Sequence, residues 1–127
     1  YHALVLGTEN KTEHLLGYFT RFGDEASDIE PIRHLYKTQV RQLASYLKIP
    51  IKILQKAPTA GMWVGQTDEG EFRFSYEEAD KILYLMYEKK YKKEAIVHAG
   101  FSQDLVERVL KMVADKSFKH KVPHIIQ

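Results

Sequence analysis

The sequence contains no cysteine. Disulfide bonds and metal sites built on thiolates are therefore excluded, and their absence suits the reducing cytoplasm. The chain also lacks any apolar run near the ~20 residues that a membrane-spanning helix needs, and no signal-peptide pattern opens it. It has neither an internal repeat nor a low-complexity segment. We therefore expect a cytoplasmic protein of ordinary globular type that does not cross a membrane.

A large excess of either charge is missing as well. The 127 residues carry 19 Lys and Arg against 17 Asp and Glu, which gives a formal net charge of +2. Apolar residues make up 44% and charged residues 28%, as in a globular protein and unlike a disordered tail. So mild a charge balance does not indicate nucleic-acid or membrane binding without a localised patch. The length corresponds to one domain or to part of one.

The first segment, residues 2–6, is apolar and predicts a strand, and the chain opens without an initiator Met. A strand this apolar is normally buried on both faces inside a parallel sheet. Only residues 51–54 offer a second, weaker candidate strand, and two short strands do not make a stable parallel sheet. We therefore expect an α/β protein of which this chain is a part, with most of the sheet outside the 127 residues.

Helical periodicity dominates the rest of the chain. The 3.6-residue apolar period predicts helical segments over residues 10–19, about 36–47, and 75–115. Asn10 with Glu13, and Ser75 with Glu78, fit capping boxes at two helix starts. Residues 56–74 instead contain Pro and Gly clusters with little periodicity, which is typical of a loop that closes over a ligand.

Polar residues follow the candidate strand and open the next helix. In parallel sheets ligands bind at the carboxyl ends of strands, where helix N-termini direct positive charge at phosphates. Thr8 lies at that junction, and its hydroxyl could bond to a nucleotide. Glu13 could hold Mg²⁺ that bridges phosphates, or could serve only as the capping-box partner of Asn10. The pattern leaves both roles of Glu13 open.

Further candidates lie on the next loop, the second helix and the C-terminal region. Arg21, Asp24 and Asp28 suit a phosphate, a ribose hydroxyl or a cationic ring, although a solvated acidic turn has the same composition. Lys37 could reach a phosphate as a point charge, or could simply be exposed. The basic cluster at residues 118–121 is either a phosphate site or a solvated end.

Residues 92–114 offer an alternative of another class. Two short helices flank a Gly-Phe-Ser turn, as in the helix-turn-helix of small DNA-binding domains. However, the second helix carries Asp104 and Glu107, which would be repelled by a phosphate backbone. The alternative is thus a small basic helical binding module without catalysis, and we do not expect nucleic acid as its partner.

Taken in chain order, these segments resemble consecutive motifs of NAD synthetases. The motifs are Gly7-Thr8-x-x-x-x-Glu13, residues 17–24, Asp28-Ile29-x-Pro31, residues 37–41, residues 57–60, Asp68-Glu69, residues 74–80 and His120-Lys121. They cover nearly the whole chain. The chain ends shortly after the His-Lys pair, which is similar to the ammonia-dependent form; the glutamine-dependent form carries these motifs on a larger chain with an N-terminal amidase domain.

The resemblance implies a parallel-sheet, adenine-nucleotide α-hydrolase-like fold (the N-type ATP pyrophosphatase fold), with residues 1–127 forming the C-terminal part of its single domain. It also implies a two-step ligation in a homodimeric enzyme. The nicotinate carboxylate of deamido-NAD attacks the α-phosphate of the co-substrate ATP, which releases pyrophosphate and leaves an acyl-adenylate. Ammonia then gives NAD and AMP. Mg²⁺ is the implied cofactor.

The same resemblance assigns residues by motif. The implied ATP contacts are Thr8, Lys37 and Thr59. The implied deamido-NAD contacts are Arg21, Asp28, His120 and Lys121. Glu13 is the implied Mg²⁺ ligand, no residue is assigned as catalytic, and residues 58–70 are the implied lid that keeps water from the intermediate.

The sequence also departs from the family pattern. Arg21 stands where Lys is common, Glu25-Ala26 replaces a frequent Gly-Gly, and Arg73 stands where Gly is usual and could hinder closure of the lid. The Ser-Gly-Gly-x-Asp-Ser pyrophosphate loop has no counterpart in the 127 residues. The resemblance therefore implies that these residues alone do not catalyse the reaction.

Overall fold

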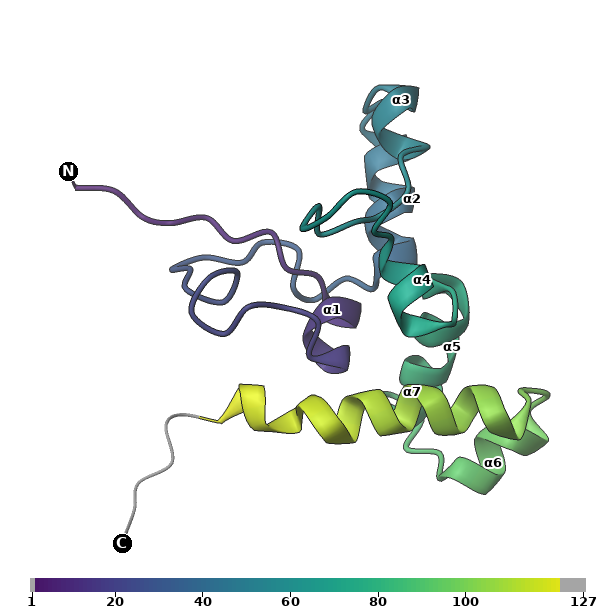
Figure 1. The fold of residues 1–127 in the computed structure, drawn as a ribbon. Coiled ribbons are helices and arrows are strands. Elements are labelled where there is room, and N and C mark those ends of the chain that lie inside the picture. The colour runs from purple at the N-terminus through teal and green to yellow at the C-terminus, as the bar shows by residue number, and fades with distance from the viewer. Residues whose placement is uncertain (1, 122–127) are drawn as a thin grey trace, which may run out of the picture.

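The computed structural model describes residues 2–121. Its helices are α1 (Lys11–Leu16), α2 (Lys37–Tyr46), α3 (Ile51–Leu54), α4 (Asp68–Phe72), α5 (Tyr76–Tyr87), α6 (Lys93–His98), α7 (Gln103–Lys116) and the 3₁₀ helix η1 (Ser117–His120). In Figure 1, α2 and α3 form an arm above α1, α4 and α5, and α7 runs horizontally below these helices with α6 beneath one of its ends. No helix in the described part of the chain is long and apolar enough to span a bilayer.

The hydrophobic core lies around α5, which contacts α1, α2, α6 and α7. Its buried members come from five of the helices and from the segments that flank them. They are Leu16, Tyr36, Phe72, Phe74, Tyr76, Ala79, Ile82, Leu83, Ile96, Leu105, Val106 and Val109. On α5 and α7 these positions recur at the predicted helical period, so both helices bury one face and leave the other to solvent.

The predicted strand over residues 2–6 differs from the structure. This segment is extended, but its pairing within residues 2–121 is limited to one parallel bridge between Leu6 and Ile29, beside which the Gly7 N–H donates to the Ile29 carbonyl over 2.7 Å. Leu4, Val5 and Leu6 are 69%, 57% and 62% exposed. A strand needs a paired neighbouring strand, and a bridge of one residue on each side does not provide it. The described part of the predicted α/β fold is therefore helical, and the parallel sheet stays a prediction.

Three further boundaries differ from the sequence-based expectation. The helix expected over residues 10–19 ends at Leu16, because Gly17 adopts a left-handed conformation with φ of 64°. The candidate strand at 51–54 was wrong, since these residues form α3 after Pro50, and a four-residue apolar run has no period that separates strand from helix. The loop expected over 56–74 contains α4, capped by the Thr67 hydroxyl.

Both predicted capping boxes are confirmed. The Asn10 side chain accepts from the Glu13 N–H, and the Glu13 carboxylate accepts from the Asn10 N–H, each over 3.1 Å. Ser75 and Glu78 make the same pair of bonds at the start of α5, at 3.2 and 2.8 Å. The chain therefore carries two matched helix starts, one beside the site described below and one far from it along the sequence.

The C-terminal end of α1 is capped by a side chain from the other end of the sequence. The Lys119 ammonium donates to the carbonyls of Gly17 and Phe19 over 2.9 and 2.7 Å. Carbonyls at the end of a helix have no partner within the helix, so a cation there satisfies them and complements the helix dipole. This contact joins η1 to α1.

We expect Gly17→Ala to destabilise the chain by about 2–5 kcal/mol. A left-handed φ costs a residue with a Cβ about 1–2 kcal/mol, and overpacking adds about 1–3 kcal/mol. The added Cβ would lie 2.5 Å from the Lys116 Cβ on α7. Gly61→Ala is the matched control, because Gly61 has a similar φ of 67° with nothing within 4 Å. Urea unfolding measures the free energy of unfolding of both variants. An equal decrease in the two would show that α7 moves aside without cost.

Candidate functional site

A cavity of about 530 Å³ opens between the start of α1, the α2–α3 arm and the loop at residues 56–60. Its wall combines hydroxyl, carboxylate and cationic groups with apolar side chains of α2 and α3, among them Val40, Ala44 and Leu54. Such a mixture suits a ligand with an apolar ring and charged substituents.

Asp24, a candidate from the residue pattern, lines this cavity, and so do four of the eight residues assigned by motif. They are Thr8, Glu13, Lys37 and Thr59, which come from the segment before α1, from α1, from the start of α2 and from the loop that follows α3. The structure thus brings together the three residues assigned to ATP and the one assigned to Mg²⁺. Ligand binding at these residues stays a prediction.

Glu13 and Lys37 form an ion pair at the cavity wall, with 2.7 Å between Lys37 Nζ and Glu13 Oε1. The second Glu13 oxygen accepts from the Asn10 N–H. One carboxylate therefore caps α1 and holds a cation at the start of α2. Its capping role, one of the two alternatives, is confirmed, and its metal role stays a prediction.

Asp80 on α5 fixes the two helix starts that carry Glu13 and Lys37. It is 5% exposed; one of its oxygens accepts from the Thr12 hydroxyl and the other from the Thr38 N–H over 2.7 Å. The Thr12 hydroxyl oxygen in turn accepts from the Lys37 N–H over 2.8 Å. A buried carboxylate with both oxygens bonded is rigid, so Asp80 sets the separation of α1 and α2.

A second buried carboxylate, Asp68, anchors α4 to the cavity wall. It accepts from the Tyr76 hydroxyl over 2.8 Å and from the Tyr18 hydroxyl over 3.1 Å. Burial, the charge of Glu13 and the bond to Asp68 raise the pKa of Tyr76, so its hydroxyl keeps its proton and donates. Burial and Asp68 likewise raise the pKa of Tyr18. The C-terminal part of the predicted lid is therefore fixed to the core.

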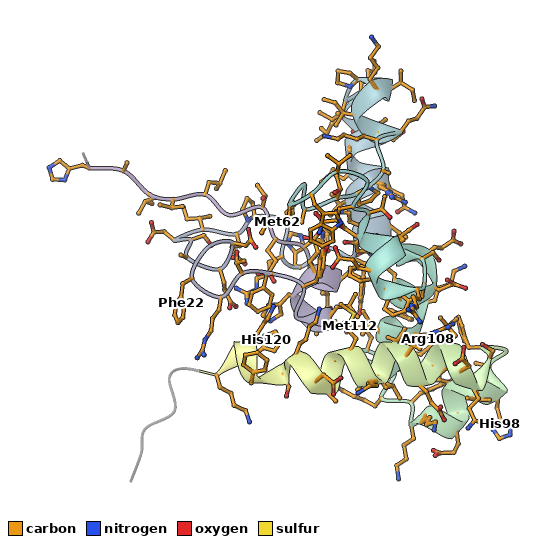
Figure 2. The ribbon with its side chains drawn as sticks, viewed as in Figure 1. Phe22, Met62, His98, Arg108, Met112 and His120 are labelled. Carbon is orange, nitrogen blue, oxygen red and sulfur yellow. The ribbon has the colours of Figure 1, made fainter. Side chains whose placement is uncertain are left out.

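The middle of the predicted lid, in contrast, faces solvent. Met62 and Trp63 are 71% and 59% exposed, and Val64 is exposed too. Figure 2 shows Met62 on the loop that projects beside α2. Trp63 therefore does not bury its ring against the body of the protein. Closure over a ligand stays a prediction.

The four residues assigned to deamido-NAD do not line the cavity. Arg21 lies over the Phe22 ring at 5.3 Å, and Asp28 accepts from the Val5 N–H over 2.8 Å. His120 lies on η1 with its ring centroid 5.4 Å from that of Phe19, a residue of the cavity wall. Lys121 is exposed just beyond η1. Of these four, His120 is placed next to the wall.

Burial, and after it the charge of the neighbouring His14, holds the pKa of His120 below its usual value. The two rings meet edge to face with centroids 4.4 Å apart. His120 is thus a neutral imidazole near neutral pH, able to accept a hydrogen bond or to bind a metal.

Sequence reasoning missed several residues of the cavity wall. Glu9, Tyr18, Phe19 and Arg41 line it, although none was singled out from the pattern. Each lies inside or beside a motif segment that was recognised, at 7–13, 17–24 or 37–41. The segments therefore carried a signal for these positions, but the residue types alone did not mark them as site residues.

With this geometry established, the chain was compared with known proteins. A model of the NAD synthase family matches residues 1–123. The NH(3)-dependent NAD(+) synthetase of Pelodictyon phaeoclathratiforme is 52% identical over 122 residues, which are 96% of this chain and 44% of that protein. The NH(3)-dependent NAD(+) synthetase of Chlorobium phaeobacteroides is 48% identical over 124 residues, which are 98% of this chain and 45% of that protein.

Solved structures agree with this assignment. An NMN synthetase from Francisella tularensis superposes with a TM-score of 0.81 at 38% identity, covering 99% of this chain and 48% of that one. An NH3-dependent NAD synthetase from Campylobacter jejuni gives a TM-score of 0.72 at 29% identity. The match covers 98% of this chain and 45% of that one.

The chain therefore belongs to the NAD synthase family, whose curated relatives are named as enzymes. The resemblance found in the sequence motifs is confirmed. The chain spans 45% and 44% of the length of the two curated relatives described.

Proposed function

We propose that the enzyme to which this chain belongs makes NAD by amidating deamido-NAD with ammonia, using ATP. The observation that carries the proposal is the cavity that gathers Thr8, Glu13, Lys37 and Thr59. Two hydroxyls, a carboxylate and an ammonium group on one wall are the groups that bind a nucleoside triphosphate and its metal.

In the proposed reaction the nicotinate carboxylate attacks the α-phosphorus of ATP, and the bond to pyrophosphate breaks. Ammonia then attacks the acyl carbon, loses a proton, and displaces AMP. For this chain, the Lys37 ammonium would offset phosphate charge, and the Thr8 and Thr59 hydroxyls would donate to the nucleotide. Asp80 would keep the starts of α1 and α2, and so Glu13 and Lys37, at a fixed separation. The chain would thus bind and orient the nucleotide.

The residues present fit Mg²⁺. This ion is usually held by one or two carboxylates together with substrate phosphates and water. Glu13 supplies one carboxylate at the cavity wall, with 17% of its side chain exposed. When bound, Mg²⁺ would neutralise charge on the departing pyrophosphate. Glu13 would hold the ion, and Lys37 would orient Glu13.

The loop at residues 58–65 supports a role in excluding water. An acyl-adenylate is hydrolysed if water reaches it, so an enzyme of this kind needs a closing segment. Pro58, Thr59 and Ala60 line the cavity, while the exposed Met62 and Trp63 have no role in the core. Closure of the loop would carry these two side chains over the ligand.

A mononucleotide is a second candidate substrate. The solved structure from Francisella tularensis, with a TM-score of 0.81, is named an NMN synthetase. The same chemistry on the corresponding mononucleotide carboxylate would give NMN. Arg21, Asp28, His120 and Lys121, the residues assigned to deamido-NAD, do not line the cavity, so the cavity lining alone does not favour the dinucleotide over the mononucleotide.

A helical binding module is supported less well. The helices α6 and α7 contact each other, as the two helices of the predicted helix-turn-helix would. However, Arg108 pairs with Asp104 over 3.0 Å and Lys111 pairs with Asp115 over 2.8 Å along the outer face of α7. Cations already paired with carboxylates attract phosphates weakly. We therefore do not propose a nucleic-acid partner.

The proposal is tested by joining this chain to the upstream segment of the Pelodictyon relative and measuring turnover. We expect NAD and AMP to form in equal amounts from deamido-NAD, ATP, Mg²⁺ and ammonia. The 127-residue chain alone is the control and should be inactive. Nicotinate mononucleotide is assayed in parallel, and a higher kcat/KM for it would favour the second candidate. A folded, joined chain that turns over neither substrate would contradict the proposal. Light scattering of the joined chain tests the expected homodimer.

A further inference from the structure

A group of side chains that could bind a metal lies beside the cavity, next to Phe19. One ligand atom from each of His14, Glu25 and His120 can be chosen so that all three lie within 4.8 Å of one another. Glu9 lies next to this group, with its Oε1 3.4 Å from His14 Nδ1, while Glu25 Oε1 lies 3.8 Å from the same nitrogen. We propose that these four residues form a binding site for a divalent transition metal of the zinc class.

The state of Glu9 points independently to a ligand. Its side chain is 1% exposed, and neither carboxylate oxygen has a hydrogen-bond partner in the described part of the chain. An unpaired buried carboxylate is costly, so buried carboxylates are found paired or coordinated to metals. A cation bound next to His14 would supply the missing partner.

The charge around this cluster also suits a divalent ion. Glu9, Glu25 and Glu30 contribute three negative charges and Arg33 contributes one positive charge. Lys119, whose charge also acts on His120, adds a second positive charge at the edge of the cluster. Three carboxylates therefore face two cations, and a bound M²⁺ ion would offset the remaining negative charge.

Arg33 is the group that the metal must move. Its Nη2 lies 2.7 Å from Glu25 Oε1 and 2.7 and 3.2 Å from the two nitrogens of the His14 ring. Its Nη1 has a separate anchor, Glu30, at 2.9 Å. The guanidinium can therefore release Glu25 and His14 and remain paired with Glu30. Arg33 competes with the metal and is not one of its ligands.

The donor set favours zinc over magnesium. Two imidazoles with carboxylates are ligands that suit Zn²⁺, Co²⁺ or Ni²⁺, whereas Mg²⁺ prefers oxygen alone. Ligand atoms on a tetrahedral zinc lie about 3.4 Å apart. In the structure the three ligand atoms lie within 4.8 Å of one another, and rotation of the exposed His120 side chain would bring them closer.

The site is tested by titrating the 127-residue chain with Zn²⁺ and Co²⁺ in excess Mg²⁺, using calorimetry and the visible spectrum of Co²⁺. We expect one equivalent to bind and Co²⁺ to show the intense bands of a tetrahedral complex. His14→Gln should weaken binding by about 100-fold or more. The control is His98→Gln on α6, at the opposite end of α7 from His120 (Figure 2), which should bind like the parent.

Arg33→Gln provides a test that does not remove a ligand. It deletes the competing cation, so Zn²⁺ should bind at least about tenfold more tightly. Misfolding cannot raise the affinity for Zn²⁺. Arg33→Gln therefore tests the site even if His14→Gln is unstable. Equal affinity of His14→Gln, Arg33→Gln and the parent, or no binding by the parent, would overturn the site.

One consequence rests on the proposed function. If His120 also contacts deamido-NAD, Zn²⁺ and deamido-NAD compete for it, and Zn²⁺ should inhibit the joined enzyme in a manner that deamido-NAD relieves. Zinc binding without such competition would retain the metal site and reject only the assignment of His120 to the substrate. An inactive enzyme whose chain still binds Zn²⁺ would reject the proposed function and leave the metal site standing.

Discussion

Glu13→Gln is expected to lower kcat of the joined enzyme by about 100-fold or more, corresponding to the several kcal/mol that a catalytic metal contributes. The substitution keeps the length of the side chain, and its amide oxygen can still accept from the Asn10 N–H. It removes the negative charge that would hold Mg²⁺ and that pairs with Lys37 over 2.7 Å. Excess Mg²⁺ should restore part of the lost rate.

Glu78→Gln is the matched control for this experiment. Glu78 occupies the same capping-box position at the start of α5 and makes the same bond to its cap residue, Ser75. A capping role alone predicts a loss of about 1 kcal/mol or less in stability for either variant, which urea unfolding measures. Full activity of Glu13→Gln, or an equal fall in kcat for Glu78→Gln, would restrict Glu13 to capping.

Asp80→Ala should destabilise the chain by about 2–6 kcal/mol in urea unfolding at neutral pH. The substitution leaves the Thr12 hydroxyl and the Thr38 N–H without their acceptor in a buried place, and each unsatisfied group costs about 1–3 kcal/mol. Asp80→Asn should cost less, since its one remaining oxygen can still accept from one of the two donors.

Asp115→Ala is the control for Asp80. The Asp115 side chain is 57% exposed and pairs only with Lys111 on the surface of α7, so its loss should change stability by less than about 0.5 kcal/mol. In the joined enzyme, Asp80→Asn should also raise KM for ATP, because the start of α2 that carries Lys37 loses its fixed position. Equal unfolding curves for the Asp80 and Asp115 variants would mean that Asp80 does not link α1 to α2.

Local features of the fold were predictable because their causes lie within a few residues. The Asn10–Glu13 and Ser75–Glu78 boxes each span three residues, and the apolar period of α7 repeats every turn. The strand pairing of residues 2–6 was not predictable, because it depends on segments that are distant in the sequence. The four-residue run that became α3 shows the same limit, since its sequence fits either a strand or a helix.

The candidate site was predicted through motifs and not through geometry. Motif order supplied Thr8, Glu13, Lys37 and Thr59, and the structure places all four on one cavity wall. Asp80 belongs to the recognised motif at residues 74–80, but its bond to Thr12, which joins positions 68 apart, was not predicted. Burial of such a carboxylate is a property of the packed chain, which composition and spacing do not encode.

The contact of Lys119 with the end of α1 has a consequence for the order of folding. The cap at Asn10 can form as soon as its own turn exists, whereas the carbonyls of Gly17 and Phe19 must wait for a residue about 100 positions later. Contacts of such long sequence separation require closure of a large loop and form slowly. During synthesis, then, α1 is made about 100 residues before the lysine that completes its C-terminal end.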